Sequence, residues 1–254
     1  MRSLILVYVI LGLITIPSIV NAQADETLVL YYPFDEGSGD EARDSSQYGN
    51  DGVMVPAADW VDGKFGGAIQ ITAAAGHVEI TSTDSLHGDI LVANFTLTAF
   101  INPALSDTWG HIWRSRPIES GHNTLFVNNT GFMSWRGMVG GAWTTLCEST
   151  PGSIFADEWQ HVAVVSDEAN LRIYIDGEMA TESAFAETDG AIETFYVGGD
   201  GQSENYTGAI DEVTVWSKAL TQDEIGILAT HGMEAIQAVD PAHKLATTWS
   251  RVKN

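Results

Sequence analysis

The sequence predicts a single antiparallel β-sandwich with one short helix near its C-terminus. Three observations support this fold class. Apolar and polar residues alternate with a period of two over most of the chain, Gly- and Asp-rich turns separate these runs, and a capped helical pattern occurs clearly once. The 254 residues suffice for one large all-β domain, and we find no internal repeat or linker-like stretch that would divide them.

Residues 1–24 have the pattern of a secretory signal peptide. Arg2 precedes an apolar run from Leu4 to Ile16, and small residues follow. Cleavage after Ala22 or after Ala24 fits this pattern equally well. The alternative is an uncleaved anchor, but the run is shorter than the ~20 residues that a membrane-spanning helix needs. We therefore expect a secreted, periplasmic or cell-surface protein without stable membrane insertion after cleavage.

Alternating patterns predict strands in the rest of the chain. In chain order these are Thr27–Phe34, Ala68–Ile71, His77–Ile80, Phe95–Ile101, Leu125–Asn128, Trp159–Val165, Leu171–Ile175 and Tyr206–Trp216. The run 159–165 is apolar enough for a central strand, and Asp176-Gly177 predicts a tight hairpin turn after the strand 171–175.

A helix is predicted to begin after Thr221. Thr221 and Glu224 have the spacing of a capping box, Ile225 and Leu228 form one apolar stripe, and Gly232 is a natural stop. We accordingly divide the chain into a signal peptide (1–24), a sandwich domain (25–232) and a C-terminal extension (233–254).

The charge balance excludes two classes of partner. The chain has 34 Asp and Glu against 11 Lys and Arg, a formal net charge of −23. Nucleic acids and anionic membranes are therefore unfavourable partners, because both require many basic residues. The single cysteine, Cys147, allows neither an intramolecular disulfide nor a zinc cluster, and we expect a buried or half-buried thiol.

Several motifs resemble one known family in content and order. They are YYPFDEGSGD and its continuation within Val29–Gly52, GKFGGAIQI at Gly63–Ile71, NFTLTAFINP at Asn94–Pro103, WQHVAVV at 159–165, LRIYIDGE at Leu171–Glu178 and GAIDEVTVWSKALTQDEI at Gly208–Ile225. The chain from about Leu28 to Ala229 thus resembles the laminin-G-like jelly-roll domains of the concanavalin A-like lectin/glucanase superfamily. The resemblance implies a two-sheet antiparallel jelly roll, an extracellular location and binding to glycans or proteins.

The resemblance also implies a structural calcium ion. Related sandwiches often hold calcium where the first and last long strands are neighbours, and the matching residues here are Asp35 and Asp211. Carboxylate and carbonyl oxygens are the ligands that calcium prefers. The alternative is that Asp35 caps the following turn and Asp211 pairs with an arginine.

The segment from Asp107 to Cys147 is the candidate ligand-binding region. It contains four of the eight tryptophans and three arginines, against only two acids. Indole faces suit sugar rings, and guanidinium groups suit carboxylate or sulfate groups. The predicted ligand-binding residues are Trp109, Trp113, Arg114, Trp135, Arg136 and Trp143. The alternative is that the tryptophans alternate into the core and that Arg114 and Arg136 meet acidic neighbours.

The sequence does not favour catalysis. The nearest approach to the paired carboxylates of laminarinase-type relatives is Glu187, Asp189 and Glu193, with one residue too many and a Gly-Ala break. Retaining hydrolysis needs two carboxylates about 5–5.5 Å apart. Motifs of serine hydrolases, zinc peptidases and phosphate loops are missing from the sequence, and His161 is expected to be a core histidine with its hydrogen bonds satisfied.

We therefore expect a non-catalytic, secreted module that binds extracellular or cell-surface glycans with the help of calcium. Two alternatives remain open. One is an extracellular protein–protein interaction module, which predicts an exposed apolar patch or self-association. The other is a glycoside hydrolase-like enzyme, which predicts a carboxylate pair in its groove.

Overall fold

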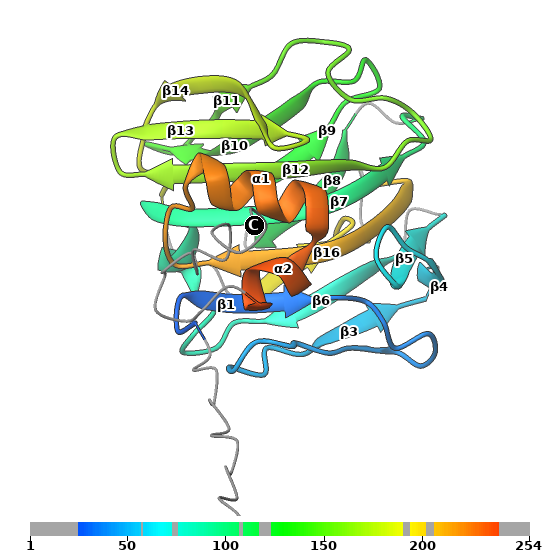
Figure 1. The fold of residues 1–254 in the computed structure, drawn as a ribbon. Helices are drawn as coiled ribbons and strands as arrows, with labels where there is room; N and C mark the ends of the chain where they lie inside the picture. The colour runs from blue at the N-terminus through cyan, green and yellow to red at the C-terminus, as the bar shows by residue number, and fades with distance from the viewer. Residues whose placement is uncertain are drawn as a thin grey trace, which may run out of the picture.

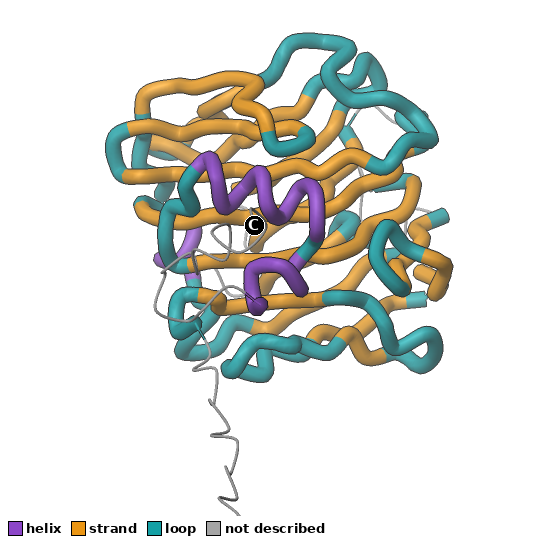
Figure 2. The backbone as a smooth tube through the Cα atoms, viewed as in Figure 1, coloured by secondary structure: helices purple, strands orange, loops and turns teal. Residues whose placement is uncertain are grey.

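Two antiparallel sheets of eight strands each stack face to face in the computed structural model (Figure 1 and Figure 2). The structure describes residues 25–56, 58–72, 76–106, 109–116, 123–189, 194–201 and 206–238. The predicted signal peptide lies outside these residues. In the described part of the chain, no helix is long and apolar enough to cross a membrane.

The first sheet has its long strands at the centre. Its spatial order is β14 (Glu178–Ala184), β13 (Asn170–Ile175), β12 (Gln160–Asp167), β7 (Asn94–Pro103), β16 (Gly208–Trp216), β5 (Gly67–Ile71) and β4 (Ala58–Asp62), with β1 (Leu28–Tyr32) paired to β16. One edge of β16 pairs with β5 at residues 208–210 and with β1 at residues 213–216. A β-bulge between Asp211 and Thr214 lies between these two pairings. The bulge re-aims the side chains of Asp211 and Glu212.

The second sheet carries the candidate ligand-binding segment. Its spatial order is β11 (Ala142–Glu148), β10 (Met133–Val139), β9 (Asn123–Val127), β8 (Gly110–Arg116), β15 (Thr194–Val197), β6 (His77–Thr81), β3 (Gly52–Val55) and β2 (Glu41–Ala42). The 3-10 helix η1 (Gly88–Leu91) precedes β7. Four consecutive strands, β8 to β11, therefore lie side by side, as antiparallel connections allow.

The main hydrophobic core lies between the two sheets. Leu97 and Ile101 contribute from the first sheet, and Trp113, Leu125 and Trp135 contribute from the second. Because side chains alternate along a strand, Thr98 and Phe100, which lie between Leu97, Ala99 and Ile101, point away from this core. The free thiol of Cys147 is buried in the same cluster, as predicted.

Two helices cover the outer face of the first sheet (Figure 1 and Figure 2). Helix α1 (Gln222–His231) begins at the predicted capping box, in which Thr221 and Glu224 exchange hydrogen bonds, and it buries Ile225 and Leu228 against the sheet. The short helix α2 (Met233–Ala238) follows directly after Gly232. Its first residue, Met233, belongs to the same apolar cluster as Ile225 and Leu228. The start of the predicted C-terminal extension therefore packs on the sandwich.

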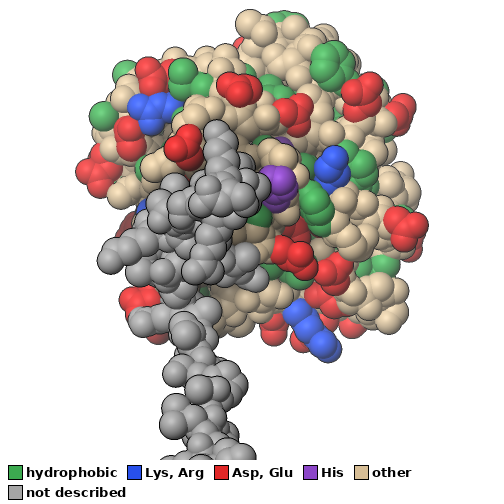
Figure 3. Space-filling view, in the orientation of Figure 1, with side chains coloured by type: hydrophobic (Ala, Val, Ile, Leu, Met, Phe, Trp, Pro, Cys, Tyr) green, Lys and Arg blue, Asp and Glu red, His purple; other side chains and the backbone are tan. Residues whose placement is uncertain are grey.

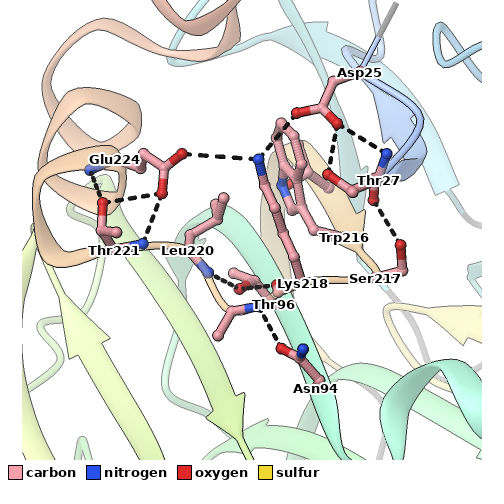
Figure 4. Close-up of polar contacts among 12 residues, drawn as sticks. Asp25, Thr27, Asn94, Thr96, Trp216, Ser217, Lys218, Leu220, Thr221 and Glu224 are labelled. Carbon is pink, nitrogen blue, oxygen red and sulfur yellow. Dashed lines mark hydrogen bonds and ion pairs between the residues drawn. The ribbon is translucent and has the colours of Figure 1, made fainter. Parts of the chain in front are cut away.

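Polar contacts tie the segment leading into α1 to β7 and to the start of the described chain (Figure 4). Lys218 Nζ donates to Asp25 near the start of the described chain at 3.0 Å and lies 3.8 Å from Glu224 on α1. Thr96 Oγ1 accepts a hydrogen bond from Leu220 N. The acids are spread widely over the surface drawn in Figure 3, where Lys and Arg are few.

The predicted fold class is confirmed, and so is the hairpin turn at Asp176-Gly177. Both residues have positive φ, 50° and 83°, as a type I′ turn requires. The predicted strands did not include β2, β3, β4, β8, β10, β11, β14 or β15. Most residues of β4, β11 and β14 are exposed or half-buried, so these strands lack a buried apolar face. β2 and β15 are short, and a β-bulge interrupts the pairing of β10.

Candidate functional site

Two of the six predicted ligand-binding residues lie in the core. Trp113 is 0% exposed and Trp135 is 1% exposed. Trp113 packs against Phe195 and Trp135 against Phe95, each with ring centroids 5.5 Å apart. A sugar ring cannot reach indole faces enclosed in this way, so assigning these two tryptophans to ligand contact was wrong.

The outer face of the second sheet carries a row of polar residues. Arg114 on β8 pairs in register with Thr124 on β9, and Thr124 pairs with Arg136 on β10. Thr145 on β11 continues the row beside Arg136. The sequence spacing of the arginines therefore becomes a single line across four strands, because partners in register project to the same side.

Arg114 is held by an acid, as the alternative interpretation expected. Its Nη1 lies 3.4 Å from Oδ2 of Asp200. Arg116, two positions further along the same face of β8, donates to the same carboxylate oxygen from its Nε at 2.7 Å. Two guanidinium groups thus contact one buried carboxylate.

Arg136 lies between two tryptophans. Its guanidinium carbon is 5.7 Å from the ring centroid of Trp109 and 5.7 Å from that of Trp143. We call these three residues the Trp–Arg–Trp cluster. Trp143 is 40% exposed, whereas Trp109 and Arg136 are partly buried. Cation–π contacts on both sides restrain the guanidinium group, so the cluster presents a fixed cation beside an exposed indole.

A layer of aromatic side chains supports the cluster from below. Trp109 meets Phe126 of β9 edge to face, with ring centroids 4.8 Å apart. Phe126 in turn packs against His111 and Phe132 and is fully buried. His111 is hydrogen-bonded to Thr124 Oγ1. The cluster therefore rests on a packed sheet surface, which limits its motion.

The hairpin that carries Trp143 is fastened at its tip. Gly140 and Gly141, both with positive φ, donate hydrogen bonds of 2.9 and 2.6 Å to the two carboxylate oxygens of Asp189. These two N–H groups hold the pKa of Asp189 below its usual range. Asp189 therefore caps a turn. Glu193, which follows Asp189 in the sequence motif compared with catalytic carboxylates, lies outside the described residues.

The two predicted calcium ligands contact one turn, that of residues 63–67. Asp35 Oδ1 accepts a hydrogen bond from Gly67 N at 2.7 Å. Asp211 Oδ2 accepts from Lys64 N and Phe65 N at 2.9 and 3.0 Å. Asp211 is fully buried and Asp35 is exposed. The structure thus brings the first and last long strands together here, and main-chain N–H groups rather than an arginine are the partners of Asp211.

Buried acids accumulate beside this turn. Burial, with the nearby Glu212 as a smaller cause, raises the pKa of Asp211 to about 7, against the opposing effect of its hydrogen bonds from Phe65 and Lys64. Burial also raises the pKa of Glu212, which accepts hydrogen bonds from the Tyr31 hydroxyl at 2.6 Å and from Met233 N at 2.8 Å. The region is therefore short of positive charge.

No group of three or more His, Cys, Asp or Glu side chains in the described ranges is arranged to hold a metal ion. A calcium ion at Asp35 and Asp211 would depend on these two carboxylates together with main-chain carbonyls. The chemistry of the donors fits calcium, because they are hard oxygen ligands. Asp35 Oδ2 accepts no hydrogen bond from any described residue.

His161 differs from its predicted state. It is buried, as expected, but neither ring nitrogen has a hydrogen-bond partner among the described residues. Its ring packs edge to face on Phe100 at 5.0 Å. Burial alone lowers the pKa of His161 to about 3, so the ring is neutral and belongs to the packing of the sheet.

Comparisons with known proteins define the class. A sequence model of the concanavalin A-like lectin/glucanases superfamily matches residues 72–226, more than half of the chain. The chain therefore belongs to this superfamily, and the resemblance seen in the sequence is confirmed. A comparison with curated protein sequences finds no match.

Solved structures with the same fold are mainly binding domains. The binding domain of Paraclostridial Mosquitocidal Protein 1 superposes with a TM-score of 0.64 at 14% identity, covering 80% of this chain and 52% of that one. The botulinum neurotoxin serotype D binding domain gives 0.64 at 15% identity, covering 81% and 52%. This chain thus spans about half the length of these domains.

A third similar structure is matched over nearly its whole length. It is domain 4 of AbnA, an extracellular arabinanase from Geobacillus stearothermophilus, in complex with arabinotriose. The TM-score is 0.62 at 18% identity, and the match covers 80% of this chain and 98% of that one. At such identities these likenesses show the fold alone.

Sequence reasoning missed three residues that organise these sites. Asp200 binds both arginines of β8, Asp189 fastens the β10–β11 hairpin, and Glu212 joins β1 to α2. Each makes contacts 21 or more residues away in sequence. Only the Gly140-Gly141 pair gives a local signal, since two adjacent glycines predict a turn with exposed N–H groups.

Proposed function

We propose that this protein is an exported, non-catalytic module that binds glycans through the Trp–Arg–Trp cluster. The observation that carries the proposal is the geometry of this cluster on the outer face of the second sheet. An exposed indole provides a flat apolar surface for a sugar ring, and a fixed guanidinium group beside it provides hydrogen-bond donors. Carbohydrate sites commonly combine these two elements.

The comparisons support a binding role. The similar toxin structures are named as binding domains, and the similar arabinanase domain is described in complex with an oligosaccharide. The whole proteins that contain those domains differ in length and activity from this chain. The proposal therefore takes from them only the general role of a binding module.

The side chains support a non-catalytic role. Asp189 is occupied by two main-chain N–H groups, and Asp200 by two arginines. Neither carboxylate is placed as the free acid or nucleophile that glycoside hydrolysis requires. Asp211 and Glu212 lie on the first sheet, away from the Trp–Arg–Trp cluster. The hydrolase alternative would be favoured by release of reducing sugar from any glycan that the protein binds.

A structural calcium ion at Asp35 and Asp211 is part of the proposal. Both carboxylates meet at one turn, and the buried acids beside them have no described Lys or Arg as an ion-pair partner. A bound divalent cation would supply the missing positive charge and fasten residues 63–67 to β16. The sugar site lies on the other sheet, so calcium would stabilise the fold without contacting the ligand.

The test of this function compares the wild type with two tryptophan variants. Binding of the mature chain to immobilised plant, bacterial and animal oligosaccharides is measured with and without EDTA. Trp143→Ala should abolish the signals, and Trp60→Ala, on the edge strand β4 of the first sheet, should leave them unchanged. If the wild type binds no glycan either with or without EDTA, a protein ligand becomes the better interpretation.

A further inference from the structure

The basic residues of this acidic chain are nearly all neutralised. In the described ranges, ion pairs join Arg43 to Glu41, Arg114 and Arg116 to Asp200, Arg172 to Asp167 and Glu182, and Lys218 to Asp25 and Glu224. Lys64 lies over the ring of Phe100. Arg136 is the one described arginine that forms no ion pair with a described carboxylate; its contacts are the two tryptophan rings.

The environment of Arg136 favours an anion. Two indole rings have their centroids 5.7 Å from the guanidinium carbon, and Nε of Arg136 is buried without a hydrogen-bond partner among the described residues. The donors that a ligand would use are therefore the terminal N–H groups. Arg114 and Arg116 lie on the same face two strands away, about 10 Å by strand spacing, and both contact the carboxylate of Asp200. Arg136 is thus the described arginine of this face without an acidic partner, and a guanidinium group favours an anionic ligand through charge-assisted hydrogen bonds.

We propose that the Trp–Arg–Trp cluster selects acidic sugars. The carboxylate or sulfate group of such a sugar accepts hydrogen bonds from the Arg136 fork, while its ring stacks on the exposed part of Trp143. This inference rests on the proposed glycan-binding function and specifies its ligand class. Neutral sugars would use the indole alone, and they would bind more weakly because charge-assisted hydrogen bonds are about twice as strong as neutral ones.

The experiment uses oligosaccharides chosen for the presence and the type of their anionic group. Trigalacturonate, its methyl ester and a sulfated galactan oligosaccharide are titrated into the mature protein at low and at high salt, alongside an array of other acidic and neutral glycans. We expect acidic members of matched pairs to bind at least tenfold more tightly than neutral ones, with affinity falling as salt rises. The two anions distinguish a carboxylate from a sulfate as the preferred group.

Two variants identify the residue responsible. Arg136→Gln should weaken binding of the acidic glycan at least tenfold and change binding of the neutral one less than threefold. Arg172→Gln, on β13 of the other sheet, removes the same charge from a residue already paired with two acids and should change neither. Thermal unfolding of each variant shows whether it is folded.

The outcomes separate the two proposals. Equal or tighter binding of neutral glycans, or acidic binding that survives Arg136→Gln, would overturn the selection for acidic sugars and leave the glycan-binding function standing. Binding of an acidic peptide in place of any glycan, or no glycan binding at all, would overturn both.

Discussion

The guanidinium carbon of Arg136 lies 5.7 Å from the ring centroid of Trp143, and it pairs with no described acid. Trp143 is one of the exposed large apolar side chains, whereas Trp113 on β8 and Trp135 on β10 of the same sheet are enclosed in the core. The tryptophans of the segment from Asp107 to Cys147 are thus divided between core and surface, because side chains alternate along a strand.

Trp143→Ala should remove glycan binding without unfolding the protein. The ring is 40% exposed, so its loss leaves no closed cavity, and we expect a change of about 1 kcal/mol or less in the free energy of unfolding. Calorimetric titration and urea unfolding measure the two effects separately. Unchanged affinity would show that the sugar site lies elsewhere.

Trp135→Ala should have the opposite profile. Removing a buried indole from between the sheets should cost about 3–5 kcal/mol of stability, because Phe95 and its neighbours lose their packing partner. Denaturant unfolding at neutral pH checks the magnitude. A variant as stable as the wild type would contradict the placement of this side chain in the core.

His161 should make the protein less stable in mild acid. The pKa of its buried ring is about 3 in the folded chain, against 6.5 for an ordinary histidine, so the unfolded chain binds a proton that the folded chain does not. Above pH 6.5 His161 is neutral in both states and does not reduce the free energy of unfolding. As the pH falls from 6.5 towards 3, proton binding to the unfolded chain lowers the free energy of unfolding progressively. Urea unfolding as a function of pH measures the slope.

His161→Leu provides the control, because it keeps an apolar side chain on Phe100 and cannot titrate. The variant should lose the part of the pH dependence that lies between 6.5 and 3. A wild type and a variant with parallel stability curves would show that His161 is protonated or solvated in the folded protein.

Calcium should stabilise the fold modestly. With the Kd of about 10⁻⁴ to 10⁻³ M that is typical of extracellular modules, about 1 mM calcium would add ~0.4–1.4 kcal/mol to the free energy of unfolding. Asp35→Asn should abolish the effect of calcium, and EDTA should reverse it in the wild type. Identical melting curves with calcium and with EDTA would exclude calcium from this turn.

Local patterns in the sequence predicted the parts of the fold that depend on local chemistry. The capping box of Thr221 and Glu224 and the Asp176-Gly177 turn are formed by residues within a few positions of each other, and both are present in the structure. Helix α2 was not predicted. Its first N–H is bound by Glu212, on a strand 21 residues earlier, and no local pattern encodes that contact.

The candidate site was predicted as a region but not residue by residue. Composition identified the segment that contains Trp109, Arg136 and Trp143, because tryptophan and arginine are concentrated there. It could not decide which tryptophans face solvent, since a β-bulge between Trp135 and Arg136 sets the register of the strand that carries Trp143. Shifting a strand by one residue exchanges its two faces.

The most direct test of the central claim is a glycan array probed with the mature wild-type chain, in the presence and absence of EDTA. We predict binding to a defined set of oligosaccharides, with acidic members prevailing and with loss of the signals in Trp143→Ala. An array without signals under both conditions, from protein shown to be folded, would contradict the assignment of this chain as a glycan-binding module.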